Sequence, residues 1–325
     1  MGAPINCRIC AGPLRLLHAG SGLEARADSF SPTNHRPGQY GDLFQCERCG
    51  TVEQPSLPHG EALLDLYRHM RDDHYLDEEA GRRATARRLL DAIGRHAPSG
   101  RLLDVGCGHG LLLDEARTRG YEVEGLELSD YASAHARDGL GLPVRQRTVA
   151  DLAAEKDPPR YAVIVLADVL EHLDDPLRTI DLSTRLLLPG GVLCLVTPDP
   201  ASRTARIAGP RWWGFLPAHT FLFPRRTLQR LLEQRGLDVA DDVPLVRSFT
   251  LRYWMAGLAE RGGALGRGVG LLQRAVPRRA SLSMSLGDER VVIARRGARY
   301  ATVGPAGAGS STTAPEAVSS SSIAS

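Results

Sequence analysis

The stretch that decides the fold is LLDVGCGHG, residues 102–110. It begins with the apolar residues of a buried strand and reaches three glycines, Gly106, Gly108 and Gly110, before an amphipathic segment. Such a turn lets the backbone approach a ligand where any Cβ would collide. The G-x-G-x-G spacing differs from the dinucleotide fingerprint G-x-G-x-x-G, and no lysine follows to make a phosphate-binding P-loop. The turn therefore predicts a strand–loop–helix site for another kind of ligand.

Three acidic residues stand at or near the ends of successive predicted strands. Asp104 precedes the glycines by two residues, where a carboxylate suits a cationic amino acid group better than a pyrophosphate. Glu127 ends the next strand, about 20 residues on, at the position from which a carboxylate accepts hydrogen bonds from ribose hydroxyls. Asp151 follows the third strand and is placed to bind an adenine amino group. A tight turn with incidental acids would not place all three in this order.

From Arg101 onward, short apolar runs alternate with amphipathic segments, which is typical of βαβ units on a parallel sheet. We therefore predict an α/β fold with a Rossmann-like, doubly wound and mostly parallel sheet. The predicted strands are 101–105, 121–126, 144–148, 161–167, 191–197, 237–247 and 290–296. The predicted helices are 110–119, 129–138, 174–187 and 225–235, with a Pro189-Gly190-Gly191 turn after the third.

The ordered motifs resemble those of class I S-adenosylmethionine-dependent methyltransferases. They are LLDVGCGHG, GLELS (125–129), VADL (149–152), VLADVLEHLDDP (165–176) and LLLPGGVLCLVTP (186–198). The resemblance implies a seven-stranded sheet with S-adenosylmethionine over the carboxyl ends of its strands. The fourth strand lacks the Asn/Asp-Pro-Pro-Tyr/Phe signature of enzymes that methylate exocyclic amino groups. The branch that modifies small molecules, quinone precursors and sugars is the better match.

The resemblance also implies which residues hold the cofactor. In the family, the positions of the three glycines cradle the methionine part, that of Glu127 holds the ribose, and that of Asp151 neighbours the adenine. Asp168, at the end of the fourth strand, is placed to position cofactor or substrate. The full predicted cofactor site is Asp104, Gly106, Cys107, Gly108, Gly110, Glu127, Leu128, Ala150, Asp151, Leu152 and Asp168.

Four of the six cysteines form two CxxC pairs, Cys7/Cys10 and Cys46/Cys49, separated by 35 residues. Thiolates at that spacing chelate one ion from a tight turn, and two such turns complete a tetrahedral S₄ site. We predict one structural zinc ion per chain, without an open position for catalysis. Zinc-ribbon modules of this kind precede the catalytic domain of some sugar C-methyltransferases and of an rRNA guanine methyltransferase, although neither pattern is matched in full.

Two histidines are candidates for a general base, because imidazole titrates near neutral pH. His219 lies in WWGFLPAHTFLFP (residues 212–224, here called the covering segment), which follows the fifth strand and is able to cover the pocket. His172 follows the fourth strand, beside the expected position of the methyl group, and is the reserve candidate. Both are also open to a purely structural role, and the aromatic residues of the covering segment either line an acceptor pocket or belong to the core.

Composition divides the chain into four predicted parts. Residues 1–60 form the zinc-ribbon-like module, 61–98 a helical connector, 99–299 the methyltransferase domain with a helical insertion near 250–280, and 300–325 a disordered tail. No apolar run approaches the ~20 residues of a membrane-spanning helix. No secretory signal is visible at the N-terminus, so we expect a cytoplasmic protein.

These features favour S-adenosylmethionine-dependent O- or C-methylation of a small molecule or sugar in a biosynthetic pathway. The first alternative is an RNA methyltransferase, because residues 201–300 carry 18 arginines against 7 acids although the cysteine-rich module is nearly neutral. The second alternative is a zinc-ribbon binding adaptor with a vestigial methyltransferase domain. The intact glycine loop argues against the adaptor.

Overall fold

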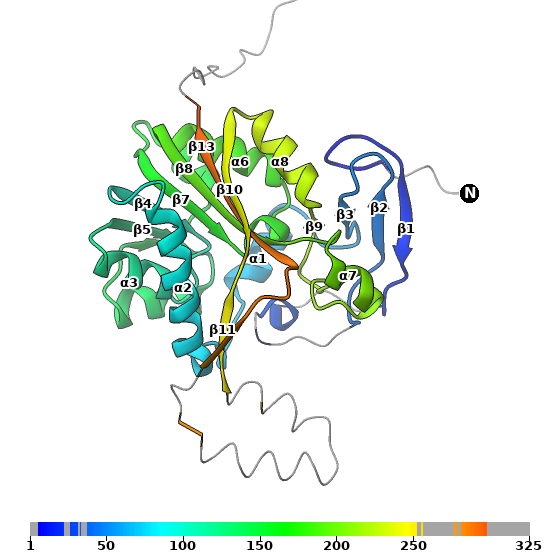
Figure 1. Ribbon diagram of the computed structural model, residues 1–325, viewed down its shortest axis with the longest axis horizontal. Helices are drawn as coiled ribbons and strands as arrows, with labels where there is room; N and C mark the ends of the chain where they lie inside the picture. Colours follow the sequence, from blue (N-terminus) through cyan, green and yellow to red (C-terminus); the bar gives the residue numbers. More distant parts are fainter. Residues whose placement is uncertain are drawn as a thin grey trace, which may run out of the picture.

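The largest element of the computed structural model is a seven-stranded sheet (Figure 1). Its strand order is β10-β13-β8-β7-β4-β5-β6, and β13 alone runs antiparallel to its neighbours. The strands are β4 (Arg101–Val105), β5 (Glu122–Leu126), β6 (Val144–Arg145), β7 (Tyr161–Ala167), β8 (Leu187–Pro198), β10 (Leu237–Pro244) and β13 (Glu289–Arg296). The predicted doubly wound, mostly parallel fold is confirmed. The structure describes residues 6–22, 27–31, 33, 38–251, 255, 276–277 and 281–297.

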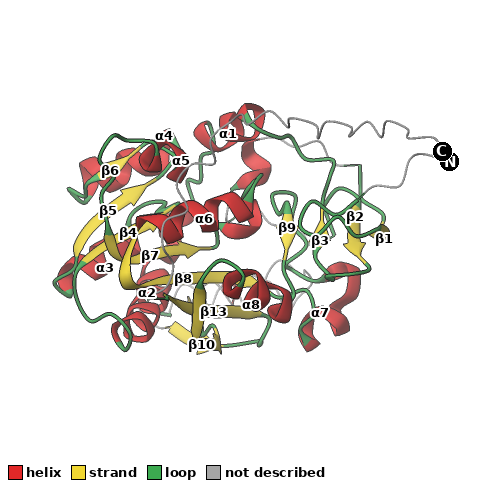
Figure 2. Cartoon of the chain, turned by 90° about the horizontal axis from the view of Figure 1, so that it is seen from above, coloured by secondary structure: helices red, strands yellow, loops and turns green. Residues whose placement is uncertain are grey.

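Helices cover both faces of this sheet (Figure 2). Successive side chains of a strand point to opposite faces, so Val163 and Val165 of β7 join one hydrophobic cluster with α2 and α3, while Ile164 and Leu166 join another with α5, α6 and α8. Burial on both faces explains the unbroken apolar run of β7. The helices are α1 (Glu61–Arg68), α2 (Glu79–Gly94), α3 (Leu111–Thr118), α4 (Asp130–Ala134), α5 (Val149–Ala153), α6 (Pro176–Leu186), α7 (Arg203–Ala208) and α8 (Arg225–Glu233).

A second, smaller sheet contains the N-terminal residues and one strand from far along the chain. Its order is β1-β2-β3-β9, and every pairing is antiparallel. The strands are β1 (Leu14–His18), β2 (Leu43–Cys46), β3 (Val52–Glu53) and β9 (Phe221–Leu222). Figure 1 shows β9 beside β3, at the edge of the small sheet nearest the main sheet. The sequence did not predict β9, because two residues carry no periodic signal.

The sequence predicts that residues 61–98 form a helical connector between the cysteine-rich module and the methyltransferase domain. The second half of this segment is α2, whose Leu89, Leu90 and Ile93 are buried in the cluster that it shares with the main sheet. These apolar residues recur at helical spacing, so one side of α2 can close a face of the sheet. The segment therefore supplies part of the main core.

The predicted strand 237–247 is two strands in the structure. β10 ends at Pro244, and β11 (Arg247–Thr250) pairs instead with β12 (Ser281–Met284). The break coincides with Pro244, which has no N–H to continue a ladder. Most of the predicted insertion near 250–280 and all of the tail 300–325 lie outside the described residues. None of the described helices combines the length and the apolarity that crossing a membrane requires.

Candidate functional site

The glycine loop joins β4 to α3 at the carboxyl end of the main sheet. Gly106, Gly108 and Gly110 all have positive φ angles of 68°, 54° and 82°, which L side chains rarely adopt. A Cβ on Gly106 would lie 2.6 Å from Val169, and one on Gly110 would lie 2.6 Å from a Leu142 methyl carbon. Gly108 has only the Tyr75 hydroxyl nearby, at 3.7 Å from its Cβ position. The outer two glycines thus serve packing, and Gly108 presents bare backbone to the site.

Two buried carboxylates lie beneath this loop. Glu127 accepts hydrogen bonds from the Gly108 and Ser129 backbone N–H groups, each at 2.8 Å, which ties the end of β5 to the loop. Burial raises the pKa of Glu127 despite these bonds. Burial, assisted by the Glu127 charge, raises the pKa of Asp104 to about 8. Burying two ionised carboxylates side by side costs free energy unless a positive charge lies near them. The loop is therefore suited to a cationic ligand.

The other predicted cofactor residues have different settings in the structure. Asp151 is exposed and forms a capping box with Thr148 at the start of α5, which lowers its pKa. Asp168 has a left-handed φ of 57° and a two-oxygen ion pair with Arg247, with both distances at 2.8 Å. Cys107 and Leu152 are buried, whereas Leu128 and Ala150 are partly exposed. Leu152 belongs to the hydrophobic core.

The two candidate histidines, which the sequence treats as alternatives, lie together. The rings of His172 and His219 meet edge to face with centroids 4.7 Å apart. Glu171 completes the group, because one ligand atom from each of the three residues lies within 4.8 Å of the others. Glu171 and His219 are buried, and His172 is partly exposed. We call these three residues the histidine cluster.

Backbone carbonyls of the covering segment fix both rings. His219 Nδ1 lies 2.7 Å from the Gly214 carbonyl oxygen, and His172 Nδ1 lies 3.1 Å from the Ala218 carbonyl oxygen. A carbonyl only accepts, so each Nδ1 carries the proton and Nε2 is the basic nitrogen of each neutral ring. Both imidazoles are therefore held in the tautomer that a general base needs.

The sequence did not predict two polar groups that lie at this cluster. Among the residues that the structure describes, the buried Tyr67 hydroxyl and Glu171 Oε2 have no hydrogen-bond partner. Tyr67 comes from α1 and meets the His172 ring at 6.1 Å. Burial, with Asp168 nearby, raises the pKa of Glu171 well above its usual range. In the sequence, Tyr67 looks like any apolar-face aromatic of an amphipathic helix, and only the Glu171-His172 adjacency hinted at Glu171.

The aromatic residues of the covering segment are core rather than pocket. Trp212, Phe221 and Phe223 are fully buried. Both Trp212 and Trp213 donate their indole N–H to one Asp288 oxygen, at 2.8 and 2.7 Å. These two indole hydrogen bonds fix the start of the covering segment, upstream of His219.

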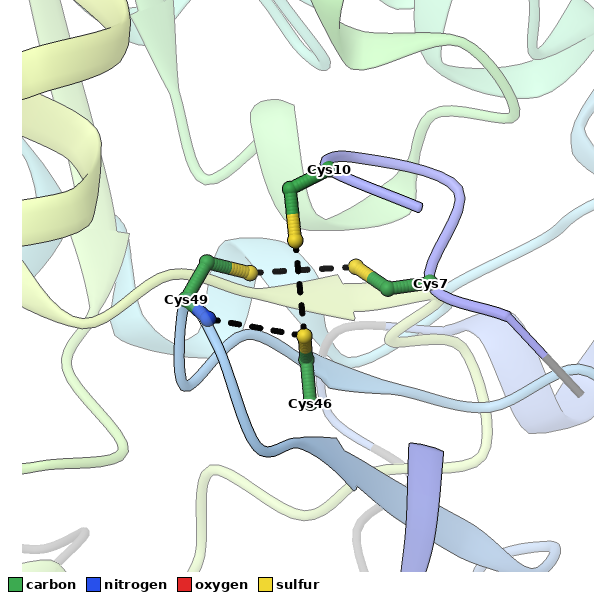
Figure 3. Close-up of side chains that lie close together, drawn as sticks. All are labelled: Cys7, Cys10, Cys46 and Cys49. Carbon is green, nitrogen blue, oxygen red and sulfur yellow. Dashed lines mark hydrogen bonds between the residues drawn. The ribbon is translucent and has the colours of Figure 1, made fainter. Parts of the chain in front are cut away.

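The four N-terminal cysteines converge from two turns (Figure 3). Their sulfur atoms all lie within 4.8 Å of one another, with Cys7 to Cys49 at 3.7 Å and Cys10 to Cys46 at 3.5 Å. A tetrahedral zinc site with bonds of ~2.3 Å has sulfur atoms about 3.8 Å apart, so the arrangement fits zinc. Backbone N–H groups also point at the sulfurs, from Ile9 to Cys7 and from Arg48 to Cys46, both at 3.4 Å. Such donors favour thiolates.

Known proteins match the same part of the chain. The family model described as "Methyltransferase domain" matches residues 73–241. A ubiquinone biosynthesis O-methyltransferase of Cereibacter sphaeroides (strain ATCC 17025) is 34% identical over 174 residues, which cover 50% of this chain and 68% of that protein. The enzyme of the same name from Leptothrix cholodnii is 31% identical over 170 residues, covering 48% and 72%.

Solved structures of low sequence identity were also found. A methyltransferase from Bacillus halodurans has a TM-score of 0.46 at 15% identity, over 66% of this chain and 99% of that one. The N-methyltransferase NodS of Bradyrhizobium japonicum, in complex with S-adenosylhomocysteine, has a TM-score of 0.45 at 16% identity, over 72% and 96%. The family model covers more than half of the chain and contains the glycine loop, the buried carboxylates and the histidine cluster. The chain therefore belongs to the class I S-adenosylmethionine-dependent methyltransferases.

Proposed function

We propose that this methyltransferase acts on a hydroxyl oxygen of a small molecule, and that the hydroxyl is phenolic. The observation that carries the proposal is the histidine cluster at the carboxyl end of the sheet, with two imidazole rings whose Nδ1 atoms face backbone carbonyls. A phenol, with a pKa of ~10 like that of tyrosine, is within reach of a histidine base, whereas an alkyl alcohol is far less acidic. The O-methyltransferase relatives support oxygen as the acceptor atom.

The loop residues would hold the cofactor by charge and shape. S-adenosylmethionine supplies a methyl group on a sulfonium, which is already a good leaving group. Asp104, at the floor of the loop, would face the cationic amino acid part, and Gly108 lets that part approach the backbone. Glu127 would accept hydrogen bonds from the ribose hydroxyls through the lone pairs that its two backbone bonds leave. Asp151, Asp168 and the neighbouring loop residues would complete the cofactor contacts.

The histidine cluster would then prepare the acceptor. His219 Nε2 accepts the hydroxyl proton, and the Gly214 carbonyl holds the ring while it becomes an imidazolium. His172 is the neighbouring ring and the second candidate for this step. An imidazolium next to the buried Glu171 carboxyl would lower the raised pKa of that group, so that its ionised form would serve as the counter-charge. Most of the acceleration comes from positioning, because the donor needs no further activation.

We also propose that the four cysteines hold one structural zinc ion. All four sulfurs are directed at a common centre, so a tetrahedral ion would be saturated and would offer no position to a substrate. Cys7 and Cys46 are buried. The family model matches residues 73–241 and so does not include the cysteine module.

A screen of acceptors with methyl-tritiated S-adenosylmethionine tests the proposed chemistry. The panel contains phenols and catechols, sugars with only alkyl hydroxyls, an amine series and total RNA. We expect transfer to a phenolic oxygen, with mass spectrometry locating the methyl group. Transfer to a sugar carbon, an amine or RNA would overturn the oxygen assignment. A protein that binds no S-adenosylmethionine in calorimetry would instead be the adaptor.

A further inference from the structure

The small sheet extends into the segment that carries the proposed base (Figures 1 and 2). β3 pairs with β9, so Val52 lies opposite Leu222 and Glu53 opposite Phe221. β9 begins two residues after His219. An isolated pair of two-residue strands has little stability of its own, so the backbone after His219 depends on the module that supplies β3.

Gln54, the residue after β3, reaches across to the same segment. Its side chain is fully buried, and its amide nitrogen is within hydrogen-bonding distance of three carbonyl oxygens: those of Leu216 (3.2 Å), Pro217 (3.3 Å) and His219 (3.0 Å). Its backbone N–H donates to the Thr220 carbonyl at 3.0 Å. Its side-chain oxygen accepts from the Gly41 backbone N–H. One side chain thus fastens the turn that contains His219 to the N-terminal module.

The turn held by Gln54 sets the position of the whole histidine cluster. The Gly214 and Ala218 carbonyls orient the two imidazole rings. The Thr220 N–H donates to the Glu171 carbonyl at 2.7 Å, which joins the turn to the end of the main sheet. A shift of this backbone would therefore move His219 and release the hydrogen bonds that select its tautomer.

The cysteine pairs in turn brace β3 and β9. Arg8, between Cys7 and Cys10, donates its backbone N–H to Glu53 Oε1 at 3.1 Å, and its guanidinium lies 4.3 Å from the centre of the Phe221 ring. Glu53 is itself buried. Cys49 lies five residues before Gln54, and its carbonyl accepts from the Thr227 hydroxyl of α8. The metal-binding turns and the covering segment are therefore packed as one unit.

We propose that Gln54 is a positioning residue for His219, through which the cysteine module controls turnover without taking part in cofactor binding. The inference rests on the proposed role of His219 as the base. Replacing the amide with an apolar group would remove the side-chain donor that the Pro217 and His219 carbonyl oxygens share, whereas the Leu216 carbonyl would keep the His219 backbone N–H. Unpaired buried carbonyl oxygens cost free energy, and we expect the turn to move so that they find other donors. A misplacement of about 1 Å at a catalytic group lowers turnover by ~10²-fold.

The test compares Gln54→Leu with Gln45→Leu, the same substitution at a less buried position of β2 in the same module. With the phenolic acceptor found by the screen, we expect Gln54→Leu to lower kcat by ~10–10²-fold and to leave the S-adenosylmethionine affinity and zinc content unchanged. Nitrogen-15 spectra of the imidazoles should show the Nδ1-protonated tautomer of His219 in the wild type and in Gln45→Leu. They should show a tautomer mixture in Gln54→Leu.

Removal of zinc from the wild-type protein by a chelator provides a second measurement that does not depend on a variant. We expect the His219 signals to change in the same direction as in Gln54→Leu, while S-adenosylmethionine still binds. Unaltered His219 signals in both experiments would overturn the proposal. If His219→Asn retains full turnover but its wild-type ring signals respond to Gln54→Leu, the positioning is correct and the assignment of the base is wrong.

Discussion

The proposed cofactor side and the proposed acceptor side of this site are built in different ways. On the cofactor side, Asp104, the glycine loop and Glu127 lie within 24 residues of one another. Asp104 lies in β4, the glycine loop follows β4, and Glu127 follows β5 of the same sheet. On the acceptor side, Gln54, Glu171 and His219 come from three distant parts of the chain. Their contacts span as many as 165 residues of sequence.

This difference predicts that cofactor binding and turnover can be lost independently of each other. The parallel sheet and its own two hydrophobic clusters hold the glycine loop. The covering segment relies on a two-residue strand pair, one glutamine and the anchors at Asp288. Damage to the acceptor side should therefore reduce turnover while cofactor binding persists.

The largest expected effect is that of His219. We expect His219→Asn to lower turnover by the ~10²–10⁴-fold typical of a general base, because no Nε2 remains to accept the proton. Calorimetry with S-adenosylmethionine should give nearly the wild-type affinity. His69→Asn, at an exposed position of the first helical region, is the control. Full turnover of His219→Asn between pH 6 and 9 would place the base elsewhere, with His172 as the next candidate.

Loss of the metal should cause the second largest decrease in turnover. We expect one zinc per chain by metal analysis, and none in Cys46→Ser with its module loosened. Turnover should fall by ~10²-fold through displacement of the histidine cluster, and S-adenosylmethionine should still bind. Cys194→Ala, outside the cysteine cluster, should keep its zinc. Freshly purified wild-type protein with four reactive thiols and no metal would contradict the zinc assignment.

Glu127 probes the cofactor side. We expect Glu127→Ala to weaken S-adenosylmethionine binding by ~1.5–3 kcal/mol, the usual contribution of hydrogen bonds to a charged group. Glu122→Ala, at the exposed start of the same strand, should bind normally. Circular dichroism has to show that the variant is folded, since Glu127 also ties β5 to the loop. A folded Glu127→Ala protein with unchanged affinity would refute the ribose contact.

The smallest effect concerns the proton on Asp104. The pKa of Asp104 is raised to about 8 in the cofactor-free protein, so at pH 7 the carboxyl is mostly protonated, and a cationic ligand favours its ionised form. Binding should then release up to about one proton, and affinity should rise with pH by at most ~10-fold per unit until pH 8. Calorimetry at pH 7 in two buffers of different ionisation enthalpy measures this release. Asp104→Asn should abolish it, and equal release in Asp104→Asn would assign the proton to another group.

The same raised pKa has a consequence for stability. The folded pKa of Asp104 lies above the value of ~3.9 for an unfolded aspartate. The folded protein therefore binds this proton more tightly, and the contribution of Asp104 to stability becomes less favourable as pH rises from about 4 to about 8. Saturating S-adenosylmethionine should reduce that decline, because its cationic group would offset the ionised carboxylate.

Local patterns were sufficient to predict the strand–loop–helix geometry around the glycines. Strand β7 has the predicted boundaries, and the glycines form the turn that their spacing implied, with positive φ angles. The cysteine spacing likewise predicted that four sulfurs meet, because a CxxC turn places two of them together. Long-range features were harder: β9 has no periodicity of its own, and the division between β10 and β11 appears only through the pairing partners of each strand.

The sequence by itself determined the doubly wound sheet, the glycine loop with its carboxylates and the grouping of the cysteines, because each depends on residues close together in the chain or on a repeating apolar period. Only the tertiary structure decided that His172 and His219 are neighbours, that Glu171 and Tyr67 face them, and that Gln54 holds their segment. Those contacts depend on how separate elements pack. The hydrogen bond between Gln54 and the His219 carbonyl cannot be predicted from the residues that neighbour either one in the sequence. For that reason the acceptor side is where the structure adds most to the sequence.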